Sequence, residues 1–393
     1  MKEGKNAFSD QSYSGIFLRF LRFGFLAWGG PVAQIGMIKK DLVDEEKWIS
    51  PQKFNRALAV YQALPGPEAH ELCVYFGHLA KGRLGGLLAG LGFMLPGFVL
   101  MLILSWIYLT FGINSALFAG VFYGMQPAVA ALIFRAVHSI GNSAVTNPLL
   151  FALFFISFLA SLLGIHFIFA LIFPATAYYF SRKKQYLLAA FSCLLILTVA
   201  FVYGSVSSFQ LSQGTAAAPA TPELFFTGLK GGLLSFGGAY TSIPFIEQDA
   251  VSKGWMTNSQ FLDGLALGGI IPAPLIIFST FVGYFAGGLG GALAMTIGIF
   301  LPAFAFTLAG HKYLEMLIIS RKLKDFLDGL TAGVIGFIGA ISVILWKEAV
   351  TDIATFAIFL LSMFILYRWH AKASVAFVMI GAGIAGLLLS GWI

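Results

Sequence analysis

The segment FGFLAWGGPVAQIGMIKKDL (residues 23–42) recurs in altered form as GGLLSFGGAYTSIPFIEQDA (residues 231–250). A second matching pair follows, KWISPQKFNRALAVYQALPGP (47–67) and GWMTNSQFLDGLALGGIIPAP (254–274). The match extends almost without gaps to Pro96 and Pro302. A repeat of this length predicts two homologous halves, each built around the same interrupted helices.

The composition places both halves in a membrane. Hydrophobic residues make up 59% of the 393 residues and charged residues only 10%, which is more apolar surface than a water-soluble core buries. Each crossing of about 30 Å needs roughly 20 mainly apolar residues, and backbone groups in lipid must be satisfied internally. Because the apolar runs do not alternate, the sequence predicts an all-α polytopic membrane protein rather than a barrel.

The apolar runs predict about thirteen transmembrane helices. They fall near residues 17–38, 56–80, 85–110, 114–138, 148–163, 165–180, 186–206, 222–247, 260–285, 288–310, 325–346, 352–369 and 373–391. With the N-terminus inside and the C-terminus outside, most of the 24 basic residues fall in cytoplasmic loops, Lys253 among them. The segment from Lys39 to Arg56 does not fit this rule, because the thirteen spans place its five basic residues on the external side of the membrane. A re-entrant first span would return the segment to the cytoplasmic side and remove this conflict.

The predicted organisation is 1–184 for the first repeat, 185–221 for a connecting helix and external linker, and 222–393 for the second repeat. Six spans plus one connecting span make the second repeat start from the opposite side of the membrane, so the repeats are inverted. Inverted repeats with helices broken at matching positions are typical of secondary transporters, whose substrate site lies where the repeats meet.

The remaining global features narrow the class of protein. The polar N-terminus has no removable signal peptide pattern. Cys73 and Cys193 are far apart in the sequence, and each lies within an apolar stretch, so neither a disulfide nor a thiolate metal site is expected. The net charge of +7 comes from residues scattered over short loops, which argues against nucleic acid binding.

Matched glycines and prolines are the strongest candidates for a binding site. Proline and glycine break helices, and a half-helix that begins inside a membrane exposes free N–H groups that attract anions. Four such ends around one centre suit a tetrahedral oxyanion, although simple kinking or close packing remains the alternative. The candidate substrate-binding residues are Gly29, Gly30, Pro31, Gln34, Pro65, Gly66, Pro67, Glu68, Lys230, Gly237, Gly238, Tyr240, Thr241, Pro272 and Pro274.

Charged side chains near the breaks are the next candidates. Lys230 either pairs with the anion or extends to the membrane interface. Glu68, His70 and Glu71 are candidates for proton coupling, while Glu68 is equally suited to capping the helix after Pro67. Arg22 fits a topology signal at the cytoplasmic end of the first span.

Two sequence patterns typical of enzymes are incomplete or absent. His70-Glu71 begins like an HExxH zinc site, but position 74 is Val, so the second ligand is missing. No Gly-rich phosphate loop ending in Lys and Ser or Thr occurs either. We therefore expect a transporter that is not an enzyme and that needs no cofactor.

Together, these motifs resemble the chromate ion transporter family in its long form, in which two homologous domains are fused. The resemblance rests on FGFLAWGGPVAQI, the WIS segment, LPGPEA followed by YFG, LLSFGGAY, GWMT, QFLDGLALG and FVGYFAGG, and it covers nearly the whole chain. It implies a multi-pass protein of the bacterial inner membrane that exports chromate, with sulfate as a competing anion. Many relatives carry a PGP triplet in the second half, where this chain has Gly269 and Ala273 in GGIIPAP.

The expected function is thus secondary transport of a tetrahedral oxyanion, chromate in the first place, by alternating access. The alternatives are a carrier of sulfate or another small anion and a passive anion channel. The expected partners are the anion and the lipid bilayer, and a homodimer stays open.

Overall fold

A computed structural model describes residues 11–112, 115–191, 219–236, 238–318, 321–369 and 373–390, together with Leu194, Leu195, Thr198 and Ala371. The regular structure of these residues is helical, and an isolated bridge joins Pro65 to Phe236. The all-α prediction is therefore confirmed. Most of the predicted connecting span 186–206, the external linker and Gly237 lie outside the described residues.

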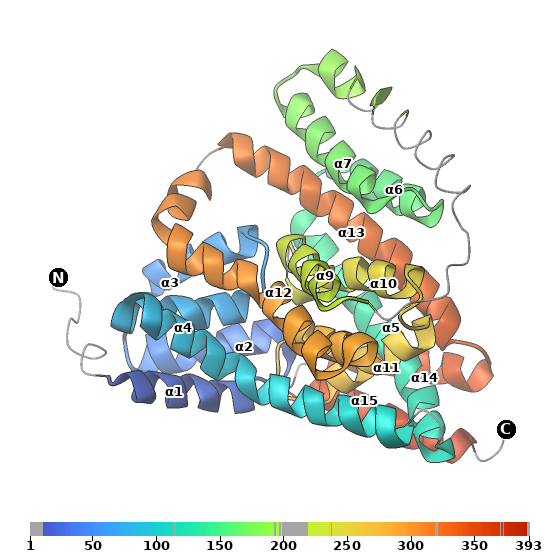
Figure 1. The fold of residues 1–393 in the computed structure, drawn as a ribbon. Helices are drawn as coiled ribbons and strands as arrows, with labels where there is room; N and C mark the ends of the chain where they lie inside the picture. The colour runs from blue at the N-terminus through green and yellow to red at the C-terminus, as the bar shows by residue number, and fades with distance from the viewer. Residues whose placement is uncertain are drawn as a thin grey trace. The chain divides into compact units, whose positions relative to one another are not determined.

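The helices of the two halves follow the same order (Figure 1). The first half contains α1 (Tyr13–Phe25), α2 (Gly30–Ile38) with its π-helical continuation η1 (Lys39–Glu45), α3 (Pro51–Ala63), α4 (Glu68–Ile107) with η2 (Tyr108–Gly112), α5 (Ala116–Ala144), α6 (Pro148–Leu162) and α7 (Phe167–Arg182). The second contains α9 (Thr221–Leu233), η3 (Ala239–Ser242), α10 (Ile243–Ser252), α11 (Asn258–Gly269), η4 (Leu275–Ile277), α12 (Phe278–Ile318), α13 (Arg321–Ala349), α14 (Ile353–Arg368) and α15 (Ser374–Ser390).

The chain forms two compact units that do not coincide with the two repeats. One unit comprises residues 1–132, 218–314 and 348–393, and the other comprises 133–217 and 315–347. All the predicted site residues that the structure describes belong to the first unit. The repeat boundaries at 184 and 222 therefore stay a prediction.

Local sequence explains several helix starts. The side chains of Ser12, Ser50 and Asn147 each accept a hydrogen bond from a backbone N–H of the first turn of α1, α3 and α6. Thr257 and Gln260 form a reciprocal capping box at α11. Such caps satisfy N–H groups that a helix leaves free at its start.

The helices α4 and α12 are each a hairpin of two legs. In α4 the helical path is broken at Lys81 (φ −141°, ψ 33°) and Gly82 (φ 62°, ψ −155°), and in α12 at Gly287 (φ −145°, ψ 23°) and Gly288 (φ 59°, ψ −151°). The legs pack closely: a Cβ at Gly77 would lie 2.4 Å from the carbonyl oxygen of Gly85. Nearly identical angles at matching positions show that the sequence repeat is also a repeat of local structure.

The first helix of each half packs in the same way on the second leg of its hairpin. A Cβ at Gly24 of α1 would lie 2.5 Å from the carbonyl oxygen of Phe93, and one at Gly232 of α9 would lie 2.4 Å from that of Ile299. Positions 24 and 93 correspond to 232 and 299 in the sequence repeat. Glycine is needed at both crossings because any side chain would collide with the neighbouring backbone.

Four predicted spans are corrected by the structure, because each folds back on itself at its break. In 17–38 the chain returns along α2 and η1, so that Glu46 accepts a hydrogen bond from Arg19 (Nη1 to Oε1, 2.6 Å). In 222–247 it returns along α10, so that Lys253 pairs with Glu223 at 3.0 Å. Each of these segments is a pair of helices folded back on each other rather than one continuous helix, and the number of membrane crossings stays a prediction.

The other two corrected spans fold back in the same manner. In 56–80 the rings of Phe54 and Phe76 stack with centroids 6.4 Å apart. In 260–285 a Cβ at Gly264 would lie 2.3 Å from the ring of Phe281. The sequence locates the breaks correctly, but a hydropathy profile does not distinguish a re-entrant pair of half-helices from one crossing.

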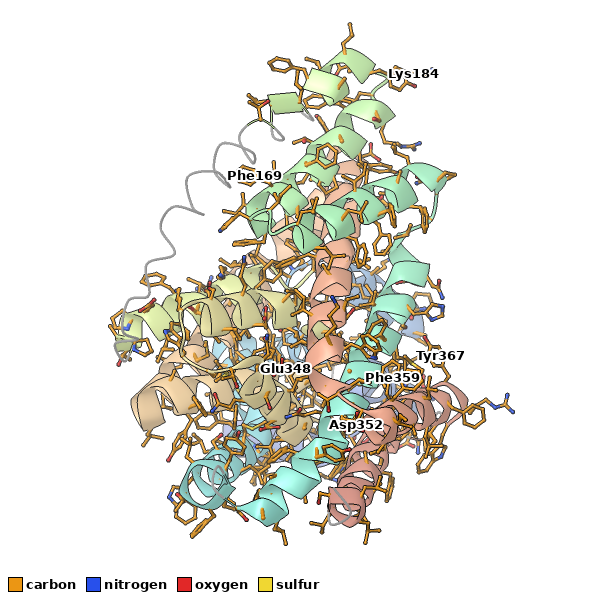
Figure 2. The ribbon with its side chains drawn as sticks, turned by 90° about the vertical axis from the view of Figure 1, so that its right-hand side faces the viewer. Phe169, Lys184, Glu348, Asp352, Phe359 and Tyr367 are labelled. Carbon is orange, nitrogen blue, oxygen red and sulfur yellow. The ribbon has the colours of Figure 1, made fainter. Side chains whose placement is uncertain are left out.

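Long apolar helices remain in both halves. Among the described residues, Glu68–Gly112, Ala116–Ala144, Leu275–Gly310 and Lys324–Ala349 are long and apolar enough to cross a membrane, and α6, α7, α14 and α15 are shorter apolar helices. Large apolar side chains cover exposed faces, for example Phe155 of α6 and Phe364 of α14. Figure 2 shows such aromatic side chains along α7 and α14, where Phe169 and Tyr367 are labelled. A lipid environment accounts for these apolar surfaces.

Candidate anion site

The break at the start of α2 exposes helix N–H groups. Gly29 (φ 88°) and Gly30 (φ 75°) adopt left-handed conformations that favour glycine, and Pro31 occupies the first turn. Among the residues that the structure describes, no side chain caps this end of α2. Gly29, Gly30 and Pro31 thus form the predicted helix break, and the binding of an anion at this helix N-terminus stays a prediction.

The corresponding break in the second half follows Gly238, which has φ 111°. The chain then forms η3, which leads directly into α10. The Thr241 hydroxyl donates to the carbonyl oxygen of Gly238 at 2.6 Å, and the Ser242 hydroxyl donates to that of Ala239 at 2.7 Å. Thr241 therefore stabilises the turn itself.

The breaks of the two halves meet. Pro65 pairs with Phe236 in an antiparallel bridge, and the N–H of Gly66 donates to the carbonyl oxygen of Ser235 at 3.4 Å. The Gln34 side chain connects the other two breaks, since its amide donates to the carbonyl oxygens of Ala27 (2.8 Å) and Ala273 (3.2 Å). The structure thus brings together breaks that are far apart in the sequence, 239 residues in the case of Gln34 and Ala273.

A small cavity lies between these breaks, with a volume of about 20 Å³. Its described lining consists of Trp28, Gly29, Gly30, Leu132, Tyr240, Gly268, Gly269, Ile271, Ala273, Leu275, Val375 and Ala376. Room for about one water molecule is too little for a tetrahedral oxyanion with four oxygen atoms.

Two carboxyl groups are buried beside glycines of the breaks. A Cβ at Gly238 would lie 3.2 Å from an oxygen of Glu68, and a Cβ at Gly66 would lie 2.9 Å from the carboxyl of Glu71. Oε2 of Glu68 and both carboxyl oxygens of Glu71 are buried without a hydrogen-bond partner in the described residues. Both groups lie at the start of α4, where the positive end of the helix favours negative charge.

The other predicted residues occupy different surroundings. His70 is fully buried, and its ring packs against those of Phe300 and Phe304 at centroid distances of 4.9 and 4.8 Å. Nζ of Lys230 lies 2.6 Å from an oxygen of Asp249, so this side chain forms an ion pair within the second half. Lys230 is not among the residues that line the small cavity.

The prolines shape the ends of the breaks. Pro67 precedes the first residue of α4, and Pro274 precedes η4, each in an extended conformation. Pro65 forms the bridge to the second half, and Pro272 lies in the loop after α11. These residues act through backbone geometry, because proline offers no N–H.

Several residues at the site were missed by sequence reasoning. Val375 and Ala376 come from α15, a small apolar helix whose sequence contains no motif. Gly268 and Gly269 carry a usable signal, since their Gly-Gly pair directly precedes the second proline break. Trp28 adjoins the first Gly-Gly pair and was predicted only as part of the family motif.

A second, polar cavity of about 540 Å³ was also missed. Asp263 of α11 lies in its wall and accepts hydrogen bonds from Tyr108 (2.7 Å) and Gln126 (2.8 Å). Each of its two carboxyl oxygens therefore accepts a hydrogen bond from a side chain of the first half. Only the isolated Asp in an apolar stretch signals this cavity in the sequence.

Comparisons with known proteins agree with the resemblance. The sequence profile described as chromate transporter matches residues 14–202 and again residues 222–387. The chromate transport protein of Pseudomonas aeruginosa is 46% identical over 387 residues, which is 96% of this chain and 92% of that protein. That of Cupriavidus metallidurans is 30% identical over 385 residues, which is 95% of this chain and 92% of that protein. No solved structure matches the chain. Two profile matches that follow one another and near full-length similarity place this chain in the chromate transporter family.

Proposed function

We propose that this protein moves chromate, a tetrahedral oxyanion, across the bacterial inner membrane by alternating access. The observation that carries the proposal is the meeting of broken helices from both halves around one small cavity. Exposed N–H groups at helix N-termini bind anions without a formal positive charge, which permits release as well as binding. The two relatives named chromate transport proteins supply the identity of the anion.

The proposed substrate site consists of the break residues that face this cavity. Gly29, Gly30 and Tyr240 line it, and Gln34 fixes the two neighbouring breaks to each other. Opening would separate the half-helices enough to admit the anion. Lys230 and Thr241 act in this proposal by supporting the second half rather than by direct contact.

Glu68 and Glu71 are the proposed sites of proton coupling. They are buried carboxyl groups beside the helix ends that an oxyanion would use. A negative Glu68 next to Gly238 repels a dianion, whereas its neutral form does not. His70 is a weaker candidate because aromatic rings surround it.

The proposed topology keeps the N-terminus cytoplasmic and the C-terminus external, with inverted repeats at 1–184 and 222–393. If the four folded-back segments are re-entrant, Lys39, Lys40, Lys47, Lys53 and Arg56 all become cytoplasmic. Lys253 then lies outside together with Lys230 and Lys347. This arrangement follows the excess of basic residues in cytoplasmic loops more closely than thirteen crossings do.

The experiment that tests this function is uptake of labelled chromate and labelled sulfate into proteoliposomes, with and without a pH gradient. We expect saturable chromate uptake that sulfate inhibits. Sulfate moving in preference to chromate would support the sulfate carrier, and flux without saturation or counter-flow would support the channel. If neither anion moves, the proposed function is wrong. Size measurement of the purified protein in detergent would decide whether it is a homodimer.

A further inference from the structure

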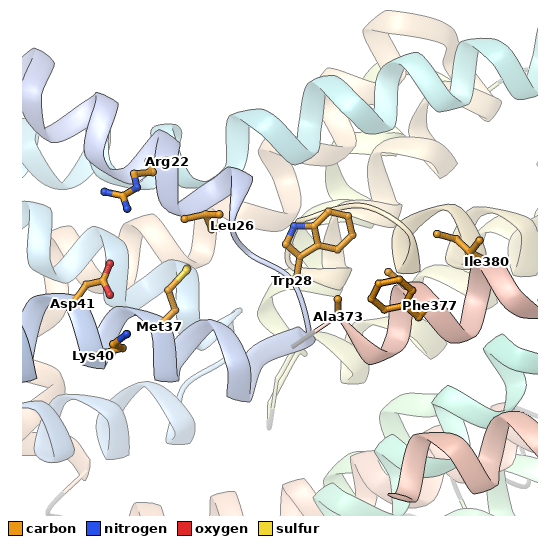
Figure 3. A pocket seen from close by; sticks show the side chains of 10 residues that line it. Arg22, Leu26, Trp28, Met37, Lys40, Asp41, Ala373, Phe377 and Ile380 are labelled. Atoms are coloured by element: carbon orange, nitrogen blue, oxygen red, sulfur yellow. The ribbon is translucent and has the colours of Figure 1, made fainter. Parts of the chain in front are cut away.

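A larger cavity, of about 610 Å³, opens between α1, the helix formed by α2 and η1, and α15. Arg22 lies on α1, whereas Lys40 and Asp41 lie on η1 across the cavity (Figure 3). The remaining described wall is apolar, with Leu26, Trp28, Met37, Ala373, Ala376, Phe377 and Ile380. This volume is ample for an oxyanion with its hydration water.

Two of the three charged groups of this cavity, Arg22 and Asp41, are available to a ligand. Within the described residues, neither Arg22 nor Asp41 has an ion-pair partner, and Lys40 pairs with Glu45 at 3.6 Å on the exposed surface. Lys40 and its partner Glu45 together add no net charge, so the cation of the described wall that is available for a new ion pair is the guanidinium of Arg22. A guanidinium can bind two oxygens of an oxyanion at once, which a single ammonium does not do with the same geometry.

The large cavity adjoins the small central one. Trp28 and Ala376 line both. Figure 3 shows Trp28 between the end of α1 and the start of α2, beside the first residues of α15. An anion that enters beside Arg22 is therefore separated from the central site by the Trp28 side chain and its neighbours.

The equivalent place in the second half is closed. The sequence repeat puts Arg22 opposite Lys230 and Asp41 opposite Asp249. Nζ of Lys230 lies 2.6 Å from Asp249, and the Thr227 hydroxyl donates to the same carboxylate at 3.1 Å. The helices α9 and α10 are in contact there, since a Cβ at Gly231 would lie 3.1 Å from Ile246. The same pair of charges is thus joined in one half and separated in the other.

We infer that Arg22, with Lys40, binds the oxyanion in the large cavity on its way to the central site, and that this cavity closes when Arg22 pairs with Asp41. The inference rests on the proposed function. The Asp41 carboxylate and the oxyanion compete for one guanidinium, so an anion bound there keeps the cavity open. Transfer of the anion to the central site frees Arg22 to form the ion pair that Lys230 and Asp249 already form in the second half.

The first test is the concentration dependence of uptake for Arg22→Gln, Arg22→Lys and the matched control Arg56→Gln, whose arginine is exposed on α3. Loss of a charge-assisted contact should raise the half-saturating concentration about tenfold or more in Arg22→Gln. Arg22→Lys should recover part of this loss, and Arg56→Gln should match the parent protein. An unchanged half-saturating concentration in Arg22→Gln would overturn the inference while leaving the proposed transport function intact.

The second test does not depend on transport. Met37, which lines the cavity, is replaced by Cys in a protein whose Cys73 and Cys193 are Ser, and its reaction with a charged thiol reagent is timed in neutral-lipid vesicles. Sulfate and molybdate serve as probes because chromate oxidises thiols. We expect them to slow the reaction, and to lose this effect when Arg22→Gln is added. Protection by vesicles containing phosphatidylglycerol but not by either oxyanion would mean that a lipid headgroup fills the cavity, and the inference would be wrong.

Discussion

Glu68 offers the sharpest single-residue test of coupling, because its carboxyl lies against Gly238 at the start of the broken helix of the other half. Glu68→Gln keeps the size of the side chain but removes its titration. We expect Glu68→Gln to transport the anion at the same rate with and without a pH gradient, measured as uptake into proteoliposomes. The control is Glu348→Gln, an exposed glutamate, which should keep the parent response. A full pH response in Glu68→Gln would exclude Glu68 as the coupling group.

Gln34 is the residue whose loss should weaken the site itself. Its amide satisfies the carbonyl oxygens of Ala27 and Ala273, which lie in breaks of opposite halves. Gln34→Ala leaves these two carbonyl oxygens without that donor, which should lower the free energy of unfolding by about 1–3 kcal/mol. The thermal melting temperature of the purified protein should fall, whereas that of the exposed control Gln52→Ala should not. Equal melting temperatures for the two variants would mean that the breaks do not depend on Gln34.

At the scale of elements, the hairpin turns of α4 and α12 depend on backbone conformation alone. Gly288 has φ 59° and ψ −151°, and a Cβ there would meet no atom within 4 Å. Gly290 also has open space around it but has no left-handed conformation. Gly288→Ala should therefore lower the unfolding free energy by about 1–3 kcal/mol, while Gly290→Ala should leave it unchanged or raise it slightly. Melting curves of both variants in the same detergent provide the comparison, and equal melting would show that the turn does not need glycine.

The breaks could be predicted from the sequence because glycine and proline act locally. Gly29, Pro67 and Pro274 each alter the backbone at their own position, so their effect is visible in the residues themselves. The return of the chain after each break depends instead on distant contacts, such as the ion pair of Lys230 with Asp249 and the packing of Gly24 on Phe93. Hydropathy averages over these contacts, which explains why four folded-back pairs of helices each resembled a single span.

The residues around the small cavity also divide into those that local sequence predicts and those that only distant packing places there. Residues that shape the backbone were found, whereas Val375 and Ala376 were missed because only the packing of α15 brings them to the cavity. Lys230 was predicted either to pair with the anion or to extend to the membrane interface, and the sequence alone did not identify Asp249 as the partner that it has here. A sequence repeat shows which positions of the two halves correspond. It does not show whether the helices at these positions are in contact, as around Lys230 and Asp249, or separated by a cavity, as around Arg22 and Asp41.

At the scale of the whole molecule, the orientation of the two halves determines whether alternating access can work. If the repeats are inverted, matching points of the two halves face opposite sides of the membrane. Gln52 at the start of α3 and Ser252 at the end of α10 are both exposed and lie near the turn that follows the first folded-back segment of each half. Single Gln52→Cys and Ser252→Cys variants, made in a protein without Cys73 and Cys193, can be labelled in intact cells with a reagent that does not cross membranes.

We expect Ser252→Cys to react from outside and Gln52→Cys to react only after the cells are permeabilised. The reason is that a re-entrant first segment returns the basic stretch from Lys39 to Arg56 to the cytoplasm, where the charge rule places it. The same assignment puts Lys253 outside, where its pairing with Glu223 compensates its charge. Labelling of both positions from one side would show that the halves are parallel. Arg22 and Lys230 would then face the same compartment, and their two ion pairs could not open in turn to opposite sides.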